Sequence, residues 1–447
     1  MLIEDRLGER ARIHGDERAI LVGLDLGEGA SWQERESMEE LIELSRTAGV
    51  QVLHTLIQKR PHPDPSHFIG KGKVEQLRVM ALASGADTVI FNDALTPAQA
   101  RNLEEKINKK IIDRAQLILN IFSQRAHSKE AKLQVELAQL EYLLPRLRGW
   151  GEALEQLGGG IGTRGPGEMR IEQERRQIKS RVHKIKERLA EITKERQTRR
   201  KLREKRQIPQ IAIIGYTNTG KSTLLNKLCN ADAFVEDKLF ATLEPLTRRS
   251  TLPDGKEVVF IDTVGFIKKL PHQLIPAFES TLEAAREADL LLNVLDVANP
   301  NLFDHWRTIN EVLNEIFKDR AWPPLLNVLN KVDRVGTEED HARLEKAKAE
   351  LNHTVEVSAL AGTNLETLRQ RIAQELEGRK EKILIEIPYT HAGLVGIIHK
   401  WGRVHQERYE LDKIYIEASL ERRRLMGLQQ KIQRDGVKLQ LLAPSPS

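Results

Sequence analysis

The stretch QIAIIGYTNTGKSTLLNKL, residues 210–228, decides the fold of the second half of this 447-residue chain. An apolar run predicts a buried strand, a short turn follows it, and a leucine-rich amphipathic segment predicts a helix. Within the turn, Gly215 to Ser222 fit the Walker A pattern G-x-x-x-x-G-K-[ST]. We therefore expect a P-loop domain with a doubly wound parallel sheet that binds nucleotide phosphates.

The loop contains the groups that phosphate binding requires. Glycines let backbone N–H groups converge on the phosphates, Lys221 reaches the β and γ phosphates, and the Ser222 hydroxyl binds Mg²⁺. The loop residues predicted to bind the nucleotide are Gly215, Tyr216, Thr217, Asn218, Thr219, Gly220, Lys221, Ser222 and Thr223.

Three later segments favour guanine. FIDTVGF (260–266) ends a predicted strand with Asp262, expected to bind Mg²⁺ through water, and Gly265, whose N–H can contact the γ phosphate. LLNVLNKVD (325–333) contains N-K-x-D, in which the Asp333 carboxylate can accept from N1 and the exocyclic amine of guanine, a donor pair that adenine lacks. The residues predicted to surround the base are Asn330, Lys331, Asp333, Ser358, Ala359 and Leu360.

The switch threonine is expected in FATLEP (240–245). Thr242 would complete Mg²⁺ coordination beside Ser222 and Asp262, and Thr247 is the alternative. We predict that Lys221, Thr242 and Gly265 carry out GTP hydrolysis to GDP and phosphate.

Two residues bear on the rate of hydrolysis. Phe266 follows D-x-x-G, where many signalling GTPases have a glutamine that orients the attacking water, so we expect slow hydrolysis without a partner. Asn218 is either a loop-stabilising side chain or, as in potassium-activated GTPases, a residue that helps to bind K⁺.

Composition indicates a folded protein with several domains. The chain is 40% apolar and 30% charged, its net charge is +5, and it has one cysteine, Cys229, which excludes an intramolecular disulfide and favours a reducing compartment. We find neither a signal peptide nor a membrane span and expect a cytoplasmic protein without stable membrane insertion.

The first 125 residues alternate apolar runs with helical patterns, which predicts a parallel α/β domain. The expected strands are 19–26, 50–57, 87–93 and 110–114. No phosphate-binding glycine pattern follows the first strand. GKGK (70–73) lacks a complete Walker loop and could contact phosphate or RNA.

Two apolar seams predict an antiparallel helical hairpin. One consists of Leu133, Leu137, Leu140, Leu144 and Leu147, and the other of Ile178, Val182, Ile185, Leu189 and Ile192. Pro145 is expected to kink the first arm, Gly149 and Gly151 to end it, and residues 199–209 to form a linker.

The second arm is strongly basic. Residues 169–207 contain sixteen lysines and arginines against six glutamates, a net +10. This is either a solvated helix face or an RNA-binding surface. The turn GGGIGTRGPGE (158–168) is either a connection or, through Arg164, a contact with RNA.

The last residues, KILIEIPY, a short helix at 394–401, RVHQERYEL and KIYIEASL, predict a small α+β domain. The expected domains are 1–125 (N-terminal α/β), 126–207 (basic hairpin), 208–376 (GTPase, or G, domain) and 377–447 (C-terminal α+β). The fold class is therefore α/β multidomain.

The chain closely resembles the HflX family of translation-associated GTPases between about Phe68 and Leu360. The resemblance rests on GYTNTGKST, LFATLEPLTR, DTVGFIKKLPHQLI, KLQVELAQL and GGGIGTRGPGE. It implies that the nucleotide roles fall on Asn218, Gly220, Lys221, Ser222, Thr223, Thr242, Asp262, Gly265, Asn330, Asp333 and Ser358. Glu244 stands where the family commonly has aspartate, a minor departure.

The resemblance also implies a function. Bacterial members bind the large ribosomal subunit, hydrolyse GTP there and split stalled ribosomes, with the hairpin turn near the peptidyl transferase centre. We therefore expect a monomeric, ribosome-dependent GTPase that uses GTP/GDP and Mg²⁺, contacts ribosomal RNA through the hairpin and splits stalled or idle ribosomes. Two alternatives remain: an RNA-binding module with a non-catalytic G domain, and an ATP-dependent RNA-remodelling enzyme acting through its N-terminal half.

Overall fold

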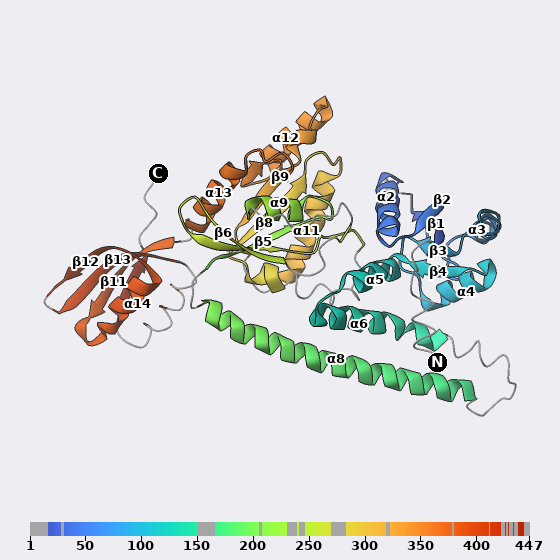
Figure 1. The fold of residues 1–447 in the computed structure, drawn as a ribbon, viewed down its shortest axis with the longest axis horizontal. Coiled ribbons are helices and arrows are strands. Elements are labelled where there is room, and N and C mark those ends of the chain that lie inside the picture. The colour runs from blue at the N-terminus through green and yellow to red at the C-terminus, as the bar shows by residue number, and fades with distance from the viewer. Residues whose placement is uncertain are drawn as a thin grey trace. The chain divides into compact units, whose positions relative to one another are not determined.

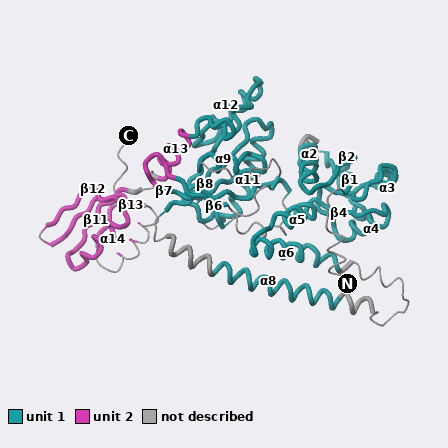
Figure 2. The backbone as a smooth tube through the Cα atoms, viewed as in Figure 1, with its two compact units in different colours: residues 1–250, 257–365 teal, residues 251–256, 366–447 magenta. Residues whose placement is uncertain are grey.

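The computed structural model describes most of the chain. The described residues are 17–27, 31–149, 166–204, 208–229, 239–240, 246–269, 283–318, 322–377, 380–410, 412–421, 425, 428, 432 and 437–441. Figure 2 shows two compact units, one of residues 1–250 with 257–365 and the other of residues 251–256 with 366–447. The four finer domain boundaries stay predictions.

The first unit begins with the predicted parallel α/β fold (Figure 1). Four parallel strands lie in the order β2-β1-β3-β4. The elements are β1 (Arg18–Asp25), α2 (Ser31–Thr47), β2 (Gln51–Lys59), α3 (Lys71–Ser84), β3 (Thr88–Phe91), α4 (Pro97–Ile107), β4 (Lys110–Asp113) and α5 (Arg114–Arg125).

Helices cover both faces of this sheet because β1 is apolar at successive positions. Ile20 and Val22 belong to a core that includes Leu77 of α3 and Leu103 of α4. Leu21 belongs to the opposite core, with residues of α2 and α5. Successive side chains of a strand point to opposite faces, so a continuous apolar run is what a doubly covered sheet requires.

The helical hairpin is present. Its elements are α6 (Lys129–Leu143), the 3₁₀ turn η1 (Arg146–Gly149) and α8 (Pro166–Glu204). The two predicted seams lie in one core cluster, in which Leu137 and Ile185 are buried, and α6 and α8 run side by side (Figure 1). Ion pairs from Arg181 to Glu136 and from Lys186 to Glu141 also connect the two helices.

Three local expectations need correction. The expected strand 110–114 ends at Asp113, whose side chain accepts from the Gln116 N–H and caps α5, so Arg114 is helical. Pro145 does not kink the first arm, because α6 ends at Leu143. The expected linker 199–209 is helical as far as Glu204. The turn residues 158–165, including Arg164, lie outside the described residues.

The G domain contains a six-stranded sheet in the order β10-β9-β8-β5-β7-β6. The β5–β7, β5–β8, β8–β9 and β9–β10 pairs are parallel. The elements are β5 (Gln210–Gly215), α9 (Lys221–Leu228), β6 (Leu246–Thr251), β7 (Glu257–Asp262), β8 (Leu290–Asp296), α11 (Leu302–Ile316), β9 (Leu325–Asn330), η3 (Val332–Arg334), α12 (Glu338–Glu350), β10 (Thr354–Glu356) and α13 (Leu365–Glu377). This is the predicted P-loop fold.

The second unit contains the predicted small α+β fold. Its antiparallel sheet has the order β12-β13-β11-β14. The elements are β11 (Lys380–Pro388), η4 (Tyr389–His391), α14 (Gly393–Trp401), β12 (Gly402–Tyr409), β13 (Lys413–Glu421) and β14 (Lys438–Leu441). Alternate residues Ile383, Ile385 and Ile387 pack with Ile398 of α14, so one sheet face forms the core.

The described helices include none that is both long enough and apolar enough to cross a membrane. The longest, α8, is dominated by charged side chains.

Candidate nucleotide-binding site

The phosphate loop connects β5 to α9. Two of its positions require glycine, because neighbouring atoms leave no room for a Cβ. A Cβ on Gly215 would lie 2.5 Å from the Val294 carbonyl oxygen of β8. A Cβ on Gly220, whose φ is +93°, would lie 2.4 Å from Nδ2 of Asn330. Because neither neighbour leaves room for a side chain, the loop backbone approaches β8 and β9 closely, and the first turn of α9 opens directly onto the loop.

Lys221 is buried at the base of this loop. Its Nζ donates to the Tyr216 carbonyl oxygen at 2.6 Å. Burial lowers the pKa of Lys221 to about 8, and Lys331 adds to this effect while Asp262 opposes it. The lysine thus lies where a phosphate would meet it in an otherwise desolvated environment, in which charge interactions are strong.

Ser222 and Asp262 place two oxygen atoms, which could act as Mg²⁺ ligands, next to each other. The Ser222 hydroxyl donates to Oδ2 of Asp262 at 2.6 Å, and Asp262 is fully buried at the end of β7. Among the described residues, no group of three or more His, Cys, Asp or Glu could bind a metal. A hydroxyl and one carboxylate instead suit Mg²⁺, which commonly takes its remaining ligands from phosphates and water.

The segment after Asp262 lies directly against the phosphate loop. The Phe266 N–H donates to the Gly215 carbonyl oxygen at 3.0 Å, and the Thr217 N–H donates to the Phe266 carbonyl oxygen at 2.9 Å. A Cβ on Gly265 would lie 2.8 Å from Nζ of Lys221. The Phe266 ring is buried in the G-domain core, so its side chain does not face the phosphate position.

Asn330 connects the base-binding segment to the phosphate loop. Its Nδ2 donates to the Thr219 carbonyl oxygen at 2.8 Å, and its Oδ1 accepts from the Ala359 N–H at 2.9 Å. One amide therefore joins three predicted segments that lie far apart in the sequence. The predicted contact between this backbone and the guanine carbonyl stays a prediction.

Lys331 makes a second connection. Its Nζ donates to the Asn218 carbonyl oxygen at 2.8 Å and pairs with Asp296 at 2.7 Å. Asp296, at the end of β8, was not among the predicted site residues. The amino-acid sequence contains a signal for Asp296. LLNVLD (291–296) and LLNVLN (325–330) are nearly identical and pair in register, so Asp296 lies beside Asn330.

Asp333 lies exposed at the rim of the site, where a base could reach it. The Ser358 hydroxyl donates to its Oδ1 at 2.5 Å, and the Ala361 N–H donates to the same hydroxyl at 3.0 Å. These two hydrogen bonds orient the Asp333 carboxylate and leave it exposed. Leu360 is 68% exposed beside it, as a residue bordering a base would be.

Two other predicted features have different outcomes. Thr242 lies outside the described residues, and Thr247 lies in β6. In GKGK, the Gly70 N–H donates to Oε1 of Gln58, and a Cβ on Gly70 would lie 2.6 Å from the Arg60 guanidinium. The Gly70 N–H, which could otherwise donate to a phosphate at the start of α3, is therefore already hydrogen-bonded within the protein.

Comparison with known proteins agrees with the site. Residues 35–123 match a family model described as GTP-binding GTPase N-terminal, residues 125–203 match the GTP-binding GTPase middle region, and residues 210–331 match the 50S ribosome-binding GTPase model. A crystal structure of a GTP-binding protein from Sulfolobus solfataricus with GDP is 27% identical, covers 80% of this chain and 98% of that one, and has a TM-score of 0.43.

Two curated relatives extend over nearly the whole chain. GTPase HflX from Caldanaerobacter subterraneus subsp. tengcongensis is 45% identical over 94% of both chains. GTPase HflX from Escherichia coli strain K12 is 39% identical over 90% of this chain and 92% of that protein. The P-loop, the arrangement of the N-K-x-D residues and these matches lead to one conclusion: the chain is a GTPase and belongs to the HflX family.

Proposed function

We propose that this GTPase binds the large ribosomal subunit, contacts ribosomal RNA through its hairpin and splits stalled or idle ribosomes. GTP binding favours the ribosome-binding form, and hydrolysis releases it. In this proposal the protein works as a monomer in the cytoplasm. The observation that carries the proposal is the basic exposed surface of α8, together with the match of residues 210–331 to the 50S ribosome-binding GTPase model.

The surface of α8 has the chemistry of an RNA contact. Over residues 172–194, the exposed basic residues outnumber the exposed acidic residues Glu172, Glu187 and Glu191. Among residues 172–194, the part of α8 whose side chains are described, the exposed basic residues are Arg176, Lys179, Arg181, Lys184, Lys186, Arg188 and Lys194. Such an excess of positive charge attracts the phosphate backbone without regard to sequence. The apolar seam faces α6, so the basic side chains remain on the surface of the hairpin.

The nucleotide site would work with Mg²⁺ bound by Ser222 and Asp262 and, as predicted, by Thr242. The metal would neutralise negative charge on the β and γ phosphates, while Lys221 binds the same phosphates and the loop N–H groups orient them. Asn218, which is exposed and has a φ of +59°, is the proposed K⁺ contact. Equal turnover in potassium and sodium chloride would remove K⁺ from this account.

The proposal is tested by sedimentation of intact ribosomes mixed with the protein. With GTP we expect free subunits, with a non-hydrolysable analogue we expect the protein to remain on the large subunit, and with GDP we expect intact ribosomes. An identical ribosome profile under all three conditions would contradict splitting. Ribosome-stimulated release of phosphate, measured in parallel, distinguishes an active enzyme from a non-catalytic RNA-binding module.

The role of the hairpin turn needs its own variant. Arg164→Ala, or replacement of residues 158–165 by a short linker, should leave GTP affinity unchanged and reduce the fraction of split ribosomes. The matched control is Lys346→Ala, since Lys346 lies exposed on α12 of the G domain. Wild-type splitting by the Arg164 variant would indicate that the turn only connects two helices.

A further inference from the structure

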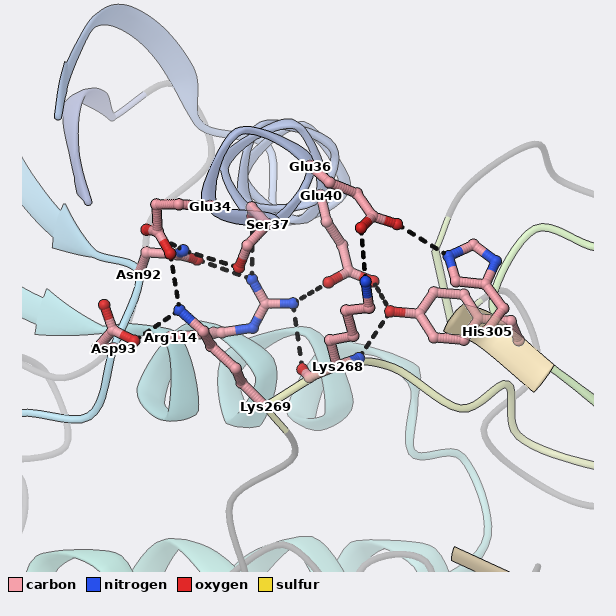
Figure 3. A network of polar contacts seen from close by, with 11 residues as sticks. Glu34, Glu36, Ser37, Glu40, Asn92, Asp93, Arg114, Lys268, Lys269 and His305 are labelled. Atoms are coloured by element: carbon pink, nitrogen blue, oxygen red, sulfur yellow. Dashed lines mark hydrogen bonds and ion pairs between the residues drawn. The ribbon is translucent and has the colours of Figure 1, made fainter. Parts of the chain in front are cut away.

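Charged side chains also gather away from the nucleotide site. One group is the acidic face of α2, formed by Glu36 and Glu40 (Figure 3). Its charges are neutralised inside the first unit, because Glu36 pairs with Lys268 and Glu40 pairs with Arg114. The other group lies on the sheet of the second unit, on the face turned away from α14, which we call the open face. Its basic side chains are mostly exposed.

The two faces of this sheet differ in chemistry. Alternate residues of the central strands β11 and β13, among them the paired Ile385 and Ile416, belong to the apolar core that includes Ile398 of α14. The residues between them point to the open face, because successive side chains of a strand alternate. Near the centre of that face, Leu384 of β11 and Tyr415 of β13 are half-buried.

The open face has an excess of positive charge. Among its described residues, five are basic and two are acidic. The basic residues are Lys382 on β11, Arg403 and Arg408 on β12, Lys413 on β13 and Lys438 on β14, and the acidic residues are Glu386 and Glu417. Glu386 already lies 3.4 Å from Nζ of Lys413. The charge of this face therefore favours an anionic partner.

A bulge in β12 places both of its arginines on the open face. Arg403 and Arg408 are five residues apart, and in a regular strand such residues point to opposite faces. The register skips His405, so Arg403 pairs with Ser419 and Arg408 pairs with Tyr415, two residues that lie four apart on β13. Directly paired side chains share a face, so both arginines lie on the side of Tyr415. Nε2 of His405 lies 2.6 Å from the Ser419 hydroxyl, a contact that stabilises the bulge.

The chemistry of this face matches a single strand of RNA. The centre of a protein–protein interface is depleted of charged residues, whereas here charged side chains from all four strands surround Tyr415. RNA offers phosphates to basic side chains and flat bases to an aromatic ring. Duplex RNA keeps its bases paired and stacked, so only a single strand can present a base to Tyr415.

We propose that the open face of the second unit binds single-stranded RNA, with Tyr415 stacked on a base and Arg403 and Arg408 bound to phosphates. Four-stranded sheets of RNA-recognition domains bind single strands through aromatic side chains on the sheet surface. Tyr415 is the only aromatic residue among the described residues of this face, so one base stacks, and binding is salt-dependent and tolerant of sequence. This inference rests neither on the hairpin nor on ribosome splitting.

The first test measures the affinity of the full-length, GDP-bound protein for a short fluorescent oligouridylate by anisotropy. Tyr415→Leu should weaken binding about tenfold, the effect of losing one stacked base, and Tyr415→Phe should preserve it. The matched control is Tyr409→Leu, which should leave the affinity unchanged. Tyr409 is 62% exposed in β12, but it pairs with Ile414 of the core face. Duplex RNA should bind Tyr415→Leu as well as it binds the wild-type protein.

The second test removes the phosphate contacts. In a plot of log affinity against log salt concentration, the double variant Arg403→Gln with Arg408→Gln should have a slope shallower by about 1.4, because each contact with a single strand contributes about 0.7. The matched control is Arg307→Gln, which should leave the slope unchanged. Arg307 is an exposed arginine of α11 that pairs with Asp304.

Crosslinking distinguishes the open face from α8, whose basic surface also attracts RNA. An oligonucleotide that contains thiouridine should crosslink to peptides of β13, and Tyr415→Leu should remove those crosslinks while any on α8 remain. The proposal is overturned if all crosslinks lie on α8, or if Tyr415→Leu and the double arginine variant bind the oligonucleotide like the wild-type protein. Normal oligonucleotide binding with weakened ribosome binding would also overturn it, because the face would then contact a ribosomal protein.

Discussion

The first unit contains two sheets with mainly parallel strands, and the candidate nucleotide site is built on the sheet of the G domain. In both, polar residues lie where the strands end. In the N-terminal sheet, Asp113 at the end of β4 accepts from Tyr142, Arg146 and the Leu95 N–H. In the G domain, Asp262 and Asn330 at the ends of β7 and β9 lie beside a glycine-containing loop and Lys221.

The difference lies in what meets the strand ends. In the N-terminal sheet, protein donors surround Asp113, and Asn92 after β3 binds Glu34, Ser37 and Arg114. In the G domain, the glycine-containing loop 215–220 and the start of α9 follow β5 instead. The same sheet architecture therefore serves domain cohesion in one case and phosphate chemistry in the other, since fold alone does not determine function.

The largest expected effect tests which sheet carries the chemistry. Lys221→Ala removes the buried ammonium beside the phosphate position and should lower GTP turnover on the order of a thousandfold. The matched variant in the N-terminal sheet is Lys110→Ala. Lys110 begins β4 and forms an ion pair with Glu17, and its removal should leave GTP turnover unchanged. Steady-state phosphate release measures both. Turnover retained by Lys221→Ala would refute the assigned site.

The next largest effect compares the two strand-end aspartates. Asp113→Ala leaves Arg146 and Tyr142 without their shared acceptor and should lower the free energy of unfolding of the N-terminal domain by about 3 kcal/mol. GDP affinity should stay at the wild-type value. Asp262→Asn should do the reverse, weakening Mg²⁺-dependent nucleotide binding more than stability. Thermal unfolding and nucleotide titration of both variants measure these effects. If the two variants lost stability and nucleotide affinity to the same extent, the two aspartates would not have different roles.

A smaller effect compares two glycines. Gly220→Ala places a Cβ 2.4 Å from Asn330 at a φ of +93°, so we expect nucleotide affinity to fall by roughly 2 kcal/mol, or about thirtyfold. Gly72→Ala in α3 has nothing within 4 Å and should be neutral or slightly stabilising. Calorimetric titration with GDP would show the difference, and equal affinities would mean that the loop relaxes freely.

The smallest effect concerns a device that both domains share. Thr96 with Gln99 caps α4, and Thr337 with Asp340 caps α12, each as a capping box. Thr96→Ala and Thr337→Ala should each lower the free energy of unfolding by about 1 kcal/mol and leave GTP turnover unchanged. Urea denaturation followed separately for each domain measures this. A loss of turnover in either variant would connect capping to the site.

The nucleotide loop was predictable because its chemistry is local. Gly215 to Ser222 are contiguous, and the strand, turn and helix that surround them follow from the same nineteen residues. The acidic face of α2 was not predictable. Glu36 and Lys268 are 232 positions apart, and glutamates on an amphipathic helix look like any solvated surface until the partner is placed.

Other differences also have physical reasons. The run 199–204 continues α8 because arginine, lysine, leucine and glutamate all favour helix, so a dense charge run does not end one. The parallel pairing of β8 and β9 was predictable from the fold class, but the hydrogen bond of 2.9 Å between Asn293 and Asn327 at its centre was not predicted. That contact depends on the register of the two strands, for which the near-identity of residues 291–296 and 325–330 was an unused signal.

Helix α8 has a mechanical consequence. At 39 residues and 1.5 Å per residue it is about 58 Å long, and it runs from the hairpin turn to the chain entering β5. Rotating such a rod by about 5° at its Glu204 end would displace its Pro166 end by ~5 Å, roughly one helical turn. A rotation that moves backbone atoms at the Glu204 end by a fraction of an ångström therefore moves the Pro166 end by several ångströms.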